Sequence, residues 1–370
     1  MKYVHRSVTL PIAPVLALAT LVLTADLPAQ TPQQASSVAS AKPATPAAPP
    51  QRIQAVSQTI GREIPLVIAH RGASGYLPEH TQESAVFAHA LGADYIEQDV
   101  VMSKDGVPVV MHDVTLNSIT NVADVFPGRD EDGKFFVFNF TWAELQKLTV
   151  HERESAGRFP ADSGNFRIAT FEQHVQLIQG LNKSRDRNAG LYVEIKKPGL
   201  HHSRGLNSSA AVLKILQKYG YADPDARVFL QCFEAAEVVR IRMELKSRLQ
   251  IIQLFSRTPT DSQLAETAKY ANGIGVKISS VVSDAKNGKA TLTDLVKAAH
   301  QQLLLVHVWT LRDDALPKFT DTPEELISYL VKDGGVDGIF TDHPDTLLAW
   351  RIKMNRQGRL KGPFHLLNSD

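Results

Sequence analysis

Short apolar runs that end on polar residues recur along the chain from residue 66 onward. The first three are residues 67–69 before His70, residues 93–96 before Glu97, and residues 108–111 before His112. An apolar run of about four to eight residues is typical of a strand buried on both faces. Parallel α/β folds place their chemistry at the carboxyl ends of such strands. We therefore expect residues 66–113 to contribute to a functional site.

Later in the chain these runs alternate with segments of helical character. Further strands are predicted at 190–193, 227–230, 249–255, 273–278, 303–308 and 338–340. Helices are predicted at 83–91, 171–180, 208–219, 235–245, 261–270, 292–301, 323–331 and 345–351. Thr81 is a suitable N-cap for the first helix and Gly92 a suitable end. Repeated strand–helix units predict parallel strands joined by right-handed crossovers.

The strand pattern favours a closed (β/α)8 barrel. It contains nine strand segments, and two of them flank the turn signal Asp105-Gly106, so one arm of that hairpin is an addition to eight barrel strands. The main alternative, an open doubly wound sheet, needs a glycine-rich phosphate turn after its first strand. Arg71-Gly72-Ala73-Ser74-Gly75 does not fit that pattern. In a barrel, all the polar clusters at strand ends meet at one mouth.

The hairpin also predicts a contact. If the chain reverses at residues 103–106, residues whose numbers sum to about 209 face each other. Glu97 then lies opposite His112, and Asp99 lies opposite Val110. Glu97 and Asp99 are two residues apart and point to the same face of the strand.

Residues 114–168 interrupt the alternation with scattered aromatic and charged residues and one helix signal at 141–148. We interpret them as an irregular subdomain inserted after the third strand, with a functional or lid role.

Both ends of the chain are predicted to lie outside the barrel domain, which we place at residues 61–355. Lys2, His5 and Arg6 precede an apolar stretch at 8–24 and small residues, the layout of a signal peptide over 1–29. A membrane anchor is the alternative, but the stretch is short and contains two prolines. Residues 30–60 are rich in Ala and Pro and predict a disordered linker, and 356–370 form a tail. We therefore expect an exported protein, periplasmic or secreted, without stable membrane insertion.

Composition narrows the function classes. The net charge is +1, so no global basic field favours nucleic acid. Cys232 is the only cysteine, which excludes an intramolecular disulfide and argues against a cysteine zinc site. The oligomeric state is left open.

Three carboxylates at predicted strand ends, Glu97, Asp99 and Glu194, form a candidate metal site. At one barrel mouth they would repel each other, and a hard divalent cation removes that penalty. Oxygen ligands suit Mg²⁺ or Ca²⁺ better than zinc. The alternative is three unrelated surface acids.

Two histidines and two cations complete the candidate site. His70 and His112 flank the proposed metal and suit acid/base catalysis, although they could instead bind metal. Arg71 and Lys196 suit phosphate binding or neutralise the acids as salt bridges. Together these groups argue for attack on a phosphodiester. Trp309 is either a pocket wall or a core residue. His80, His89, His201 and His202 have no comparable context, and we interpret them as loop or surface residues.

A series of motifs resembles the exported bacterial glycerophosphodiester phosphodiesterases. They are His70-Arg71-Gly72, Pro78-Glu79-His80-Thr81, Glu97-Gln98-Asp99, His112-Asp113, Glu194-Ile195-Lys196, Gln231-Cys232-Phe233 and Thr341-Asp342-His343-Pro344-Asp345. The likeness covers residues 66–350 in order, including the insertion.

The resemblance implies a TIM barrel of the phosphatidylinositol-phospholipase-C-like type that hydrolyses small glycerophosphodiesters to an alcohol and sn-glycerol 3-phosphate. It implies one divalent cation, commonly Ca²⁺, with Mg²⁺ as the alternative. His70 and His112 match the acid/base pair, and Glu97, Asp99 and Glu194 match the metal ligands. Arg71 and Lys196 match residues that contact phosphate. From their places at predicted strand ends, we also assign substrate binding to Gln231 and Trp309.

Two other functions are compatible with the same fold. One is a phospholipase that acts on membrane lipids, for which residues 135–140 are the candidate membrane-facing segment. The other is a catalytically silent binding protein, which the full set of histidines and carboxylates argues against. The chain departs from the family at Asn117-Ser118 and at His307-Val308-Trp309-Thr310, so the preferred head group is left open.

Overall fold

A computed structural model of the chain describes residues 64–357, apart from 154–156 and 161–163. The predicted signal peptide at 1–29 and linker at 30–60 lie outside the described residues. So does the predicted tail at 356–370, apart from residues 356 and 357.

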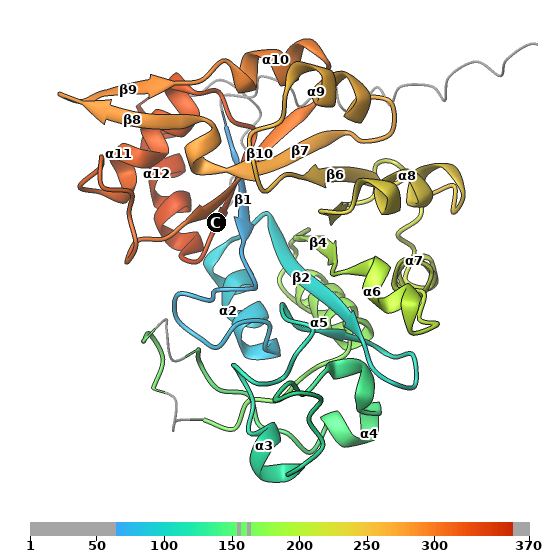
Figure 1. Cartoon of the computed structure of the whole chain (residues 1–370). Helices are drawn as coiled ribbons and strands as arrows, with labels where there is room; N and C mark the ends of the chain where they lie inside the picture. The colour runs from blue at the N-terminus through green and yellow to red at the C-terminus, as the bar shows by residue number, and fades with distance from the viewer. Residues whose placement is uncertain (1–63, 154–156, 161–163, 358–370) are drawn as a thin grey trace, which may run out of the picture. The chain divides into compact units, whose positions relative to one another are not determined.

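Eight parallel strands close into a barrel in the described part of the chain (Figure 1). The first strand, β1, pairs with both β11 and β2, and this double pairing closes the sheet. The predicted (β/α)8 barrel is therefore confirmed. Its strands are β1 (Leu66–Ala69), β2 (Tyr95–Met102), β4 (Gly190–Ile195), β5 (Val228–Cys232), β6 (Gln250–Leu254), β7 (Gly273–Lys277), β10 (Leu305–Leu311) and β11 (Gly338–Thr341).

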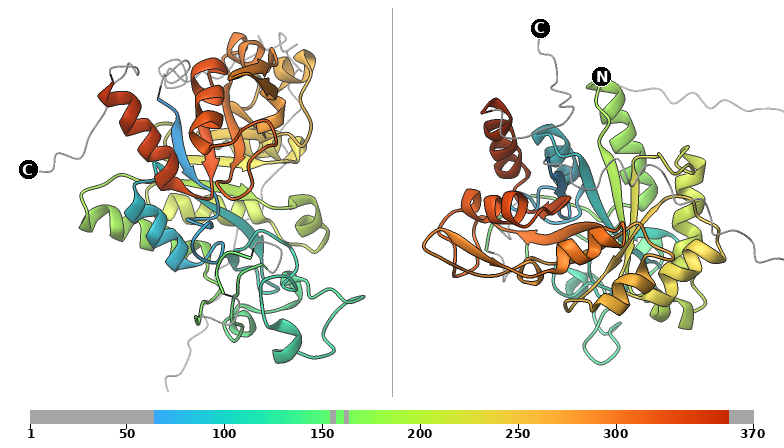
Figure 2. Two further views of the ribbon diagram at one scale, coloured as in Figure 1. Left: turned by 90° about the vertical axis from the view of Figure 1, so that its left-hand side faces the viewer. Right: turned by 90° about the horizontal axis from the view of Figure 1, so that it is seen from above.

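Helices surround the strands, as the view from above shows (Figure 2). Thr81 caps the first of them by accepting a hydrogen bond from the Ser84 backbone, and Gly92, at a φ of 102°, ends it, both as predicted. The main helices are α2 (Gln82–Leu91), α5 (Phe171–Ser184), α7 (Ser208–Lys218), α8 (Ala235–Met243), α9 (Asp261–Thr267), α10 (Leu295–Gln301), α11 (Pro323–Ser328) and α12 (Pro344–Arg356), with a short α6 (Pro198–Ser203) after β4. Among the described residues, no helix is both long and apolar enough to cross a membrane.

Alternate residues of each barrel strand point inward or outward. The outward set, which includes Val67, Ile96 and Leu191, packs against the helices in the main core. The inward set fills the barrel interior with one large side chain from each of seven strands: Ile68, Tyr95, Tyr192, Phe229, Ile252, Leu305 and Phe340. On the eighth strand, β7, Gly273 and Gly275 leave room for neighbouring side chains. The next inward residues of β1, β2, β4 and β5 are His70, Glu97, Glu194 and Gln231, and these line the barrel mouth.

The predicted hairpin forms, but its register differs from the prediction by one residue. Strand β3 (Pro108–Val110) runs antiparallel to β2 and pairs Val100 with Val110 and Met102 with Pro108. The paired numbers sum to 210, not 209. The reason is the turn, in which Lys104-Asp105-Gly106 form a three-residue loop closed by a Ser103–Val107 hydrogen bond, with Gly106 at a φ of 77°.

The residues between β3 and α5 form a subdomain with its own apolar core. It contains α3 (Val122–Val125), a 3₁₀ turn η1 (Val137–Asn139) and α4 (Trp142–Leu145). Thr141 and Glu144 form the predicted capping box of α4, but that helix ends at Leu145. The core includes Leu116, Phe140 and Leu148, so the insertion is packed and anchored on the hairpin through Val101 and Val109.

The structure also contains a hairpin that was not predicted, formed by β8 (Val282–Lys286) and β9 (Lys289–Leu292). It follows a 3₁₀ turn η2 (Ile278–Ser280) at the end of β7, and its residues are mostly exposed.

Candidate active site

The predicted site residues meet at the carboxyl ends of the barrel strands. His70, Glu97, Asp99, Glu194, Gln231 and Trp309 continue the inward phase of β1, β2, β4, β5 and β10. A cavity of about 130 Å³ lies there, and all nine predicted site residues line it. Its lining is His70, Arg71, Glu97, Asp99, His112, Glu194, Lys196, Gln231, Phe233, Leu254, Trp309, Thr310, Arg312 and Phe340.

The three carboxylates of the candidate metal site converge as predicted. Glu97, Asp99 and Glu194 are buried and each offers an oxygen within 4.8 Å of the others. Strand pairing of Asp99 with Glu194 explains this convergence. Asp99 Oδ1 is buried without a hydrogen-bond partner among the described residues. An all-oxygen set with an unpartnered carboxylate oxygen suits a hard divalent cation.

Neighbouring groups hold the two Glu97 oxygens in place. Gln231 Nε2 donates to Glu97 Oε1 at 2.8 Å, and the Arg71 backbone N–H donates to Oε2 at 2.9 Å. Lys196 Nζ lies 2.8 Å from Glu194 Oε1 and 4.0 Å from Asp99 Oδ2. Gln231 and Lys196 therefore position and neutralise the acids as well as lining the cavity.

The carboxylates respond to this crowding in different ways. Burial, together with the charges of Asp99 and Glu194, raises the pKa of Glu97 well above its usual value. Burial likewise raises the pKa of Glu194 to about 7. Burial also acts to raise the pKa of Asp99, but Lys196 and His80 outweigh it and hold that pKa well below the ordinary value. Glu97 and Glu194 therefore ionise less readily than an ordinary glutamate, and a bound cation would favour their charged forms.

Each candidate catalytic histidine is paired with a carboxylate through the same ring nitrogen. His70 Nδ1 lies 2.6 Å from Asp342 Oδ1, and His112 Nδ1 lies 2.6 Å from Asp113 Oδ1. A carboxylate at Nδ1 fixes the tautomer that carries its proton there and leaves Nε2 for proton transfer. Burial lowers the pKa of His70 to about 4 and also lowers the pKa of His112. Both imidazoles line the cavity and can exchange a proton through Nε2.

From the sequence, we interpret His80 as a loop or surface residue, and it does lie in a loop but not on the surface. His80 is buried, and its Nε2 lies 3.0 Å from Asp99 Oδ2. It lies in the loop before α2 at a φ of 61°, where no strand pattern marked it. The motif Pro78-Glu79-His80-Thr81 was the available signal. His89 and His201 are buried as well, so the surface interpretation fails for them too.

A second network, which sequence reasoning missed, connects the insertion to the site. Arg153 donates to both oxygens of Glu79, at 2.8 and 2.7 Å, and to Asp113 Oδ2 at 2.9 Å. Glu79 also accepts from Arg71 Nη1 at 2.8 Å. Arg71 is therefore connected to Arg153 through Glu79, and Arg153 is connected to His112 through Asp113. No sequence signal marked Arg153, because the insertion has no regular periodicity.

This arrangement defines a class of protein: a (β/α)8 barrel hydrolase with two histidine–carboxylate pairs, an acidic metal-type site and cations at one mouth. The Glycerophosphoryl diester phosphodiesterase family profile matches residues 70–346. A glycerophosphodiester phosphodiesterase of Haemophilus influenzae is 38% identical over 76% of this chain and 88% of its own length. The Treponema pallidum enzyme of that name is 34% identical over 76% and 90%. The chain therefore belongs to this family of enzymes.

Solved structures agree with the fold. A structure from Silicibacter pomeroyi, provisionally named a glycerophosphoryl diester phosphodiesterase, is 27% identical, with a TM-score of 0.63 over 79% of this chain and 94% of its own. A phosphodiesterase of Oleispira antarctica, solved in complex with the product sn-glycerol-3-phosphate, is 22% identical, with a TM-score of 0.57 over 78% and 96%.

Proposed function

We propose that the protein hydrolyses glycerophosphodiesters to an alcohol and sn-glycerol 3-phosphate at this barrel mouth. The observation that carries the proposal is the pair of histidine–carboxylate dyads that line one cavity together with the acidic cluster, Arg71 and Lys196. The family match and the named relatives support the substrate class.

The two histidines suit a two-step reaction. In the first step, one imidazole takes the proton of the glycerol 2-hydroxyl as its oxygen attacks phosphorus. The bond from phosphorus to the head-group oxygen breaks, the other imidazole protonates that oxygen, and a cyclic phosphate forms. In the second step, water attacks the cyclic phosphate with the proton roles reversed and yields glycerol 3-phosphate. Asp342 and Asp113 hold the two rings in the required tautomer.

Glu97, Asp99 and Glu194 would hold the divalent cation, and we propose Ca²⁺ as its identity. Three carboxylates and no nitrogen ligand suit Ca²⁺, and Mg²⁺ is the alternative with the same preference for oxygen. When bound, such an ion supplies positive charge to the phosphoryl oxygens. Arg71 and Lys196 supply charge at the same cavity from the protein itself.

A metal-controlled assay tests this function. Purified protein is treated with chelator, dialysed and incubated with glycerophosphocholine, and glycerol 3-phosphate is measured with and without added Ca²⁺ or Mg²⁺. We expect release that is lost with chelator and restored best by Ca²⁺. No release at any metal concentration would refute the proposal.

The phospholipase alternative loses its structural candidate. Phe135, Phe138 and Phe140 are buried, and Phe136 stacks on Phe138 with ring centroids 5.0 Å apart. Residues 135–140, the candidate membrane-facing segment, therefore pack within the insertion and against its neighbours. An assay that compares intact lipid with its deacylated diester separates the two functions, and we expect turnover of the deacylated diester.

We propose that the protein is exported, to the periplasm or beyond the cell. Support comes from the basic, then apolar, then small-residue order of residues 1–29. Cell fractionation with N-terminal sequencing tests this proposal. A cytoplasmic protein that retains Met1 would contradict it.

A further inference from the structure

A second hollow adjoins the catalytic cavity on the side of β10. It encloses about 350 Å³ and shares Trp309, Thr310 and Arg312 with the catalytic cavity. Small-molecule sites enclose roughly 300–1,000 Å³, so the catalytic cavity of about 130 Å³ is small for a whole diester, whereas the second hollow lies in that range. The two together provide space for the phosphate with its glycerol and for the group on the other side of the phosphate.

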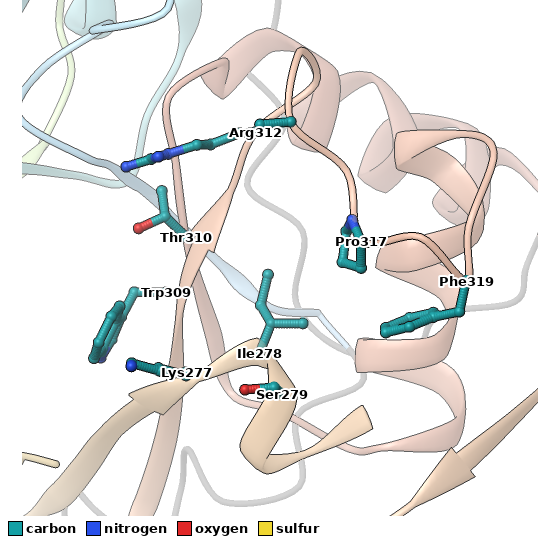
Figure 3. A pocket seen from close by; sticks show the side chains of 9 residues that line it. Lys277, Ile278, Ser279, Trp309, Thr310, Arg312, Pro317 and Phe319 are labelled. Carbon is teal, nitrogen blue, oxygen red and sulfur yellow. The ribbon is translucent and has the colours of Figure 1, made fainter. Parts of the chain in front are cut away.

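The lining of this second hollow is cationic and amphipathic. Its charged side chains are Lys277 and Arg312, and no acidic side chain lines it among the described residues. Ser279 and Thr310 add hydroxyl groups. Figure 3 shows Ile278 facing Pro317 and Phe319, which form an apolar wall.

Strand register fixes the position of Lys277. It is the last residue of β7 and pairs with Trp309 of β10. Its Nζ lies 5.8 Å from the centroid of the Trp309 ring, and the two side chains lie together in Figure 3. Lys277 is exposed, and no acidic side chain lines the hollow beside it among the described residues. Its charge is therefore available to a ligand.

Arg312 is only partly neutralised. Its Nε lies 3.1 Å from Asp342 Oδ2, but its side chain is 43% exposed. Asp342 also pairs with Arg158 Nη2 at 2.8 Å and with His70. Arg158 is also paired with Asp314, 2.6 Å from its Nε, so it adds no free charge. The positive charge left at the hollow is that of Lys277 and of the exposed part of Arg312.

This charge pattern discriminates between head groups. A quaternary ammonium ligand is usually bound on an open aromatic face. Here an ammonium group of the protein already lies over Trp309, and a second cation there would be repelled. An anionic head group would instead meet Lys277 and Arg312.

We propose that this hollow is the head-group site of the enzyme and that it selects diesters whose alcohol carries a second anionic group, such as a phosphate. The proposal rests on the proposed function, because the scissile phosphate must lie in the catalytic cavity. Binding energy from the head group then favours anionic diesters over neutral and cationic ones.

The test compares three diesters with matched glycerophosphate ends: bis(glycerophospho)glycerol, glycerophosphoglycerol and glycerophosphocholine. We expect the full-length enzyme to have its highest kcat/KM for the first and its lowest for the last. In Lys277→Met, the ratio of the first value to the last falls about two- to fivefold, mainly through KM, as for an exposed ion pair. In Lys277→Glu, the ratio of kcat/KM for bis(glycerophospho)glycerol to that for glycerophosphocholine falls further. The control Lys183→Met, which removes the charge of an exposed lysine in the last turn of α5, leaves the ratio at the wild-type value.

Calorimetric binding of bis(glycerophospho)glycerol and glycerophosphocholine to the same variants separates this proposal from the proposed function. If no diester is hydrolysed, the proposed function fails, and the binding ratio still decides the nature of the hollow. Ratios that are equal in wild type, Lys277→Met and Lys277→Glu would overturn the anionic head-group site. A ratio that falls equally in Lys183→Met would also overturn it, because the effect would then be one of net charge.

Discussion

His70 Nδ1 and Asp342 Oδ1 lie 2.6 Å apart and connect the ends of the first and last barrel strands. The two residues are 272 positions apart in the sequence, and pairing of β1 with β11 brings them together. Closure of the barrel thus places Asp342 where it favours the His70 tautomer with its proton on Nδ1, which leaves Nε2 for proton transfer.

Asp342→Asn should lower kcat by about a hundredfold or more, because it removes the partner that orients His70. His70→Ala should cost at least as much. If Asp342 acts through His70, the double variant should lose no more than His70→Ala alone, since residues that act as a unit are not additive. Steady-state kinetics on the three variants provides the measurement, and multiplicative losses would contradict the positional role.

Arg153 should matter for both stability and activity. Arg153→Met leaves the buried Glu79 with Arg71 alone and removes the ion-pair partner of Asp113. We expect a loss of unfolding free energy on the order of 2 kcal/mol, below the range for a fully buried pair because Arg71 still pairs with Glu79. Urea unfolding measures it. The control Arg248→Met breaks a pair that is 67% and 68% exposed and should change stability by less than about 1 kcal/mol. Equal effects of the two variants would refute the network.

The acidic cluster predicts a stabilising ion. Ca²⁺ at about a hundred times its Kd should add about 2.7 kcal/mol to the free energy of unfolding, because a ligand that binds only the folded state stabilises it. Thermal unfolding with chelator and with Ca²⁺ measures this shift. Glu194→Gln should lose most of it, whereas Asp223→Asn at an exposed position should retain it. A shift of the same size in Glu194→Gln would exclude the cluster as the binding site.

The buried side chain of His307 should make the protein less stable in acid. It is fully buried beneath the mouth, where Tyr192 Oη lies 2.7 Å from its Nδ1, and burial lowers its pKa from 6.5 to about 4. The unfolded state therefore binds more protons between these values, so this contribution to stability is present above about pH 6.5 and is lost toward pH 4. Its slope approaches about 1.4 kcal/mol per pH unit.

His307→Asn keeps a polar partner for Tyr192 and removes the titrating group. Urea unfolding from pH 7.5 to 4.5 should show a shallower loss of stability in the variant than in wild type. Parallel curves would contradict the assignment to His307.

The barrel and the acidic cluster could be predicted from the sequence for a physical reason. Strands buried on both faces produce continuous apolar runs, and the period of two places Glu97 and Asp99 on one face wherever the strand is packed. The predicted register of the β2–β3 hairpin was wrong by one residue. Which residues of the two strands face each other depends on whether the loop between them has three or four residues. Asp105-Gly106 signals a turn but does not decide its length.

The residues that hold the site residues in place could not be predicted from the sequence pattern. His80 and Arg153 lie in irregular segments, where neither period nor capping signals relate a side chain to a face. Their contacts with Asp99 and Glu79 depend on how the loop before α2 and the insertion pack on the barrel. The head-group hollow likewise depends on the pairing of Lys277 with Trp309, which only the β7–β10 register reveals.

Turnover by His112→Ala tests the central claim most directly. His112 lines the cavity from the start of the insertion, and its partner Asp113 is its neighbour in the chain, so removal of the imidazole should leave the barrel intact. Release of glycerol 3-phosphate from glycerophosphocholine is measured for wild type and variant at saturating Ca²⁺, with circular dichroism and thermal unfolding on the same samples. The account predicts a folded variant whose kcat falls by about 10²–10⁴, the range for a lost general acid or base. Wild-type turnover in the folded variant would contradict it.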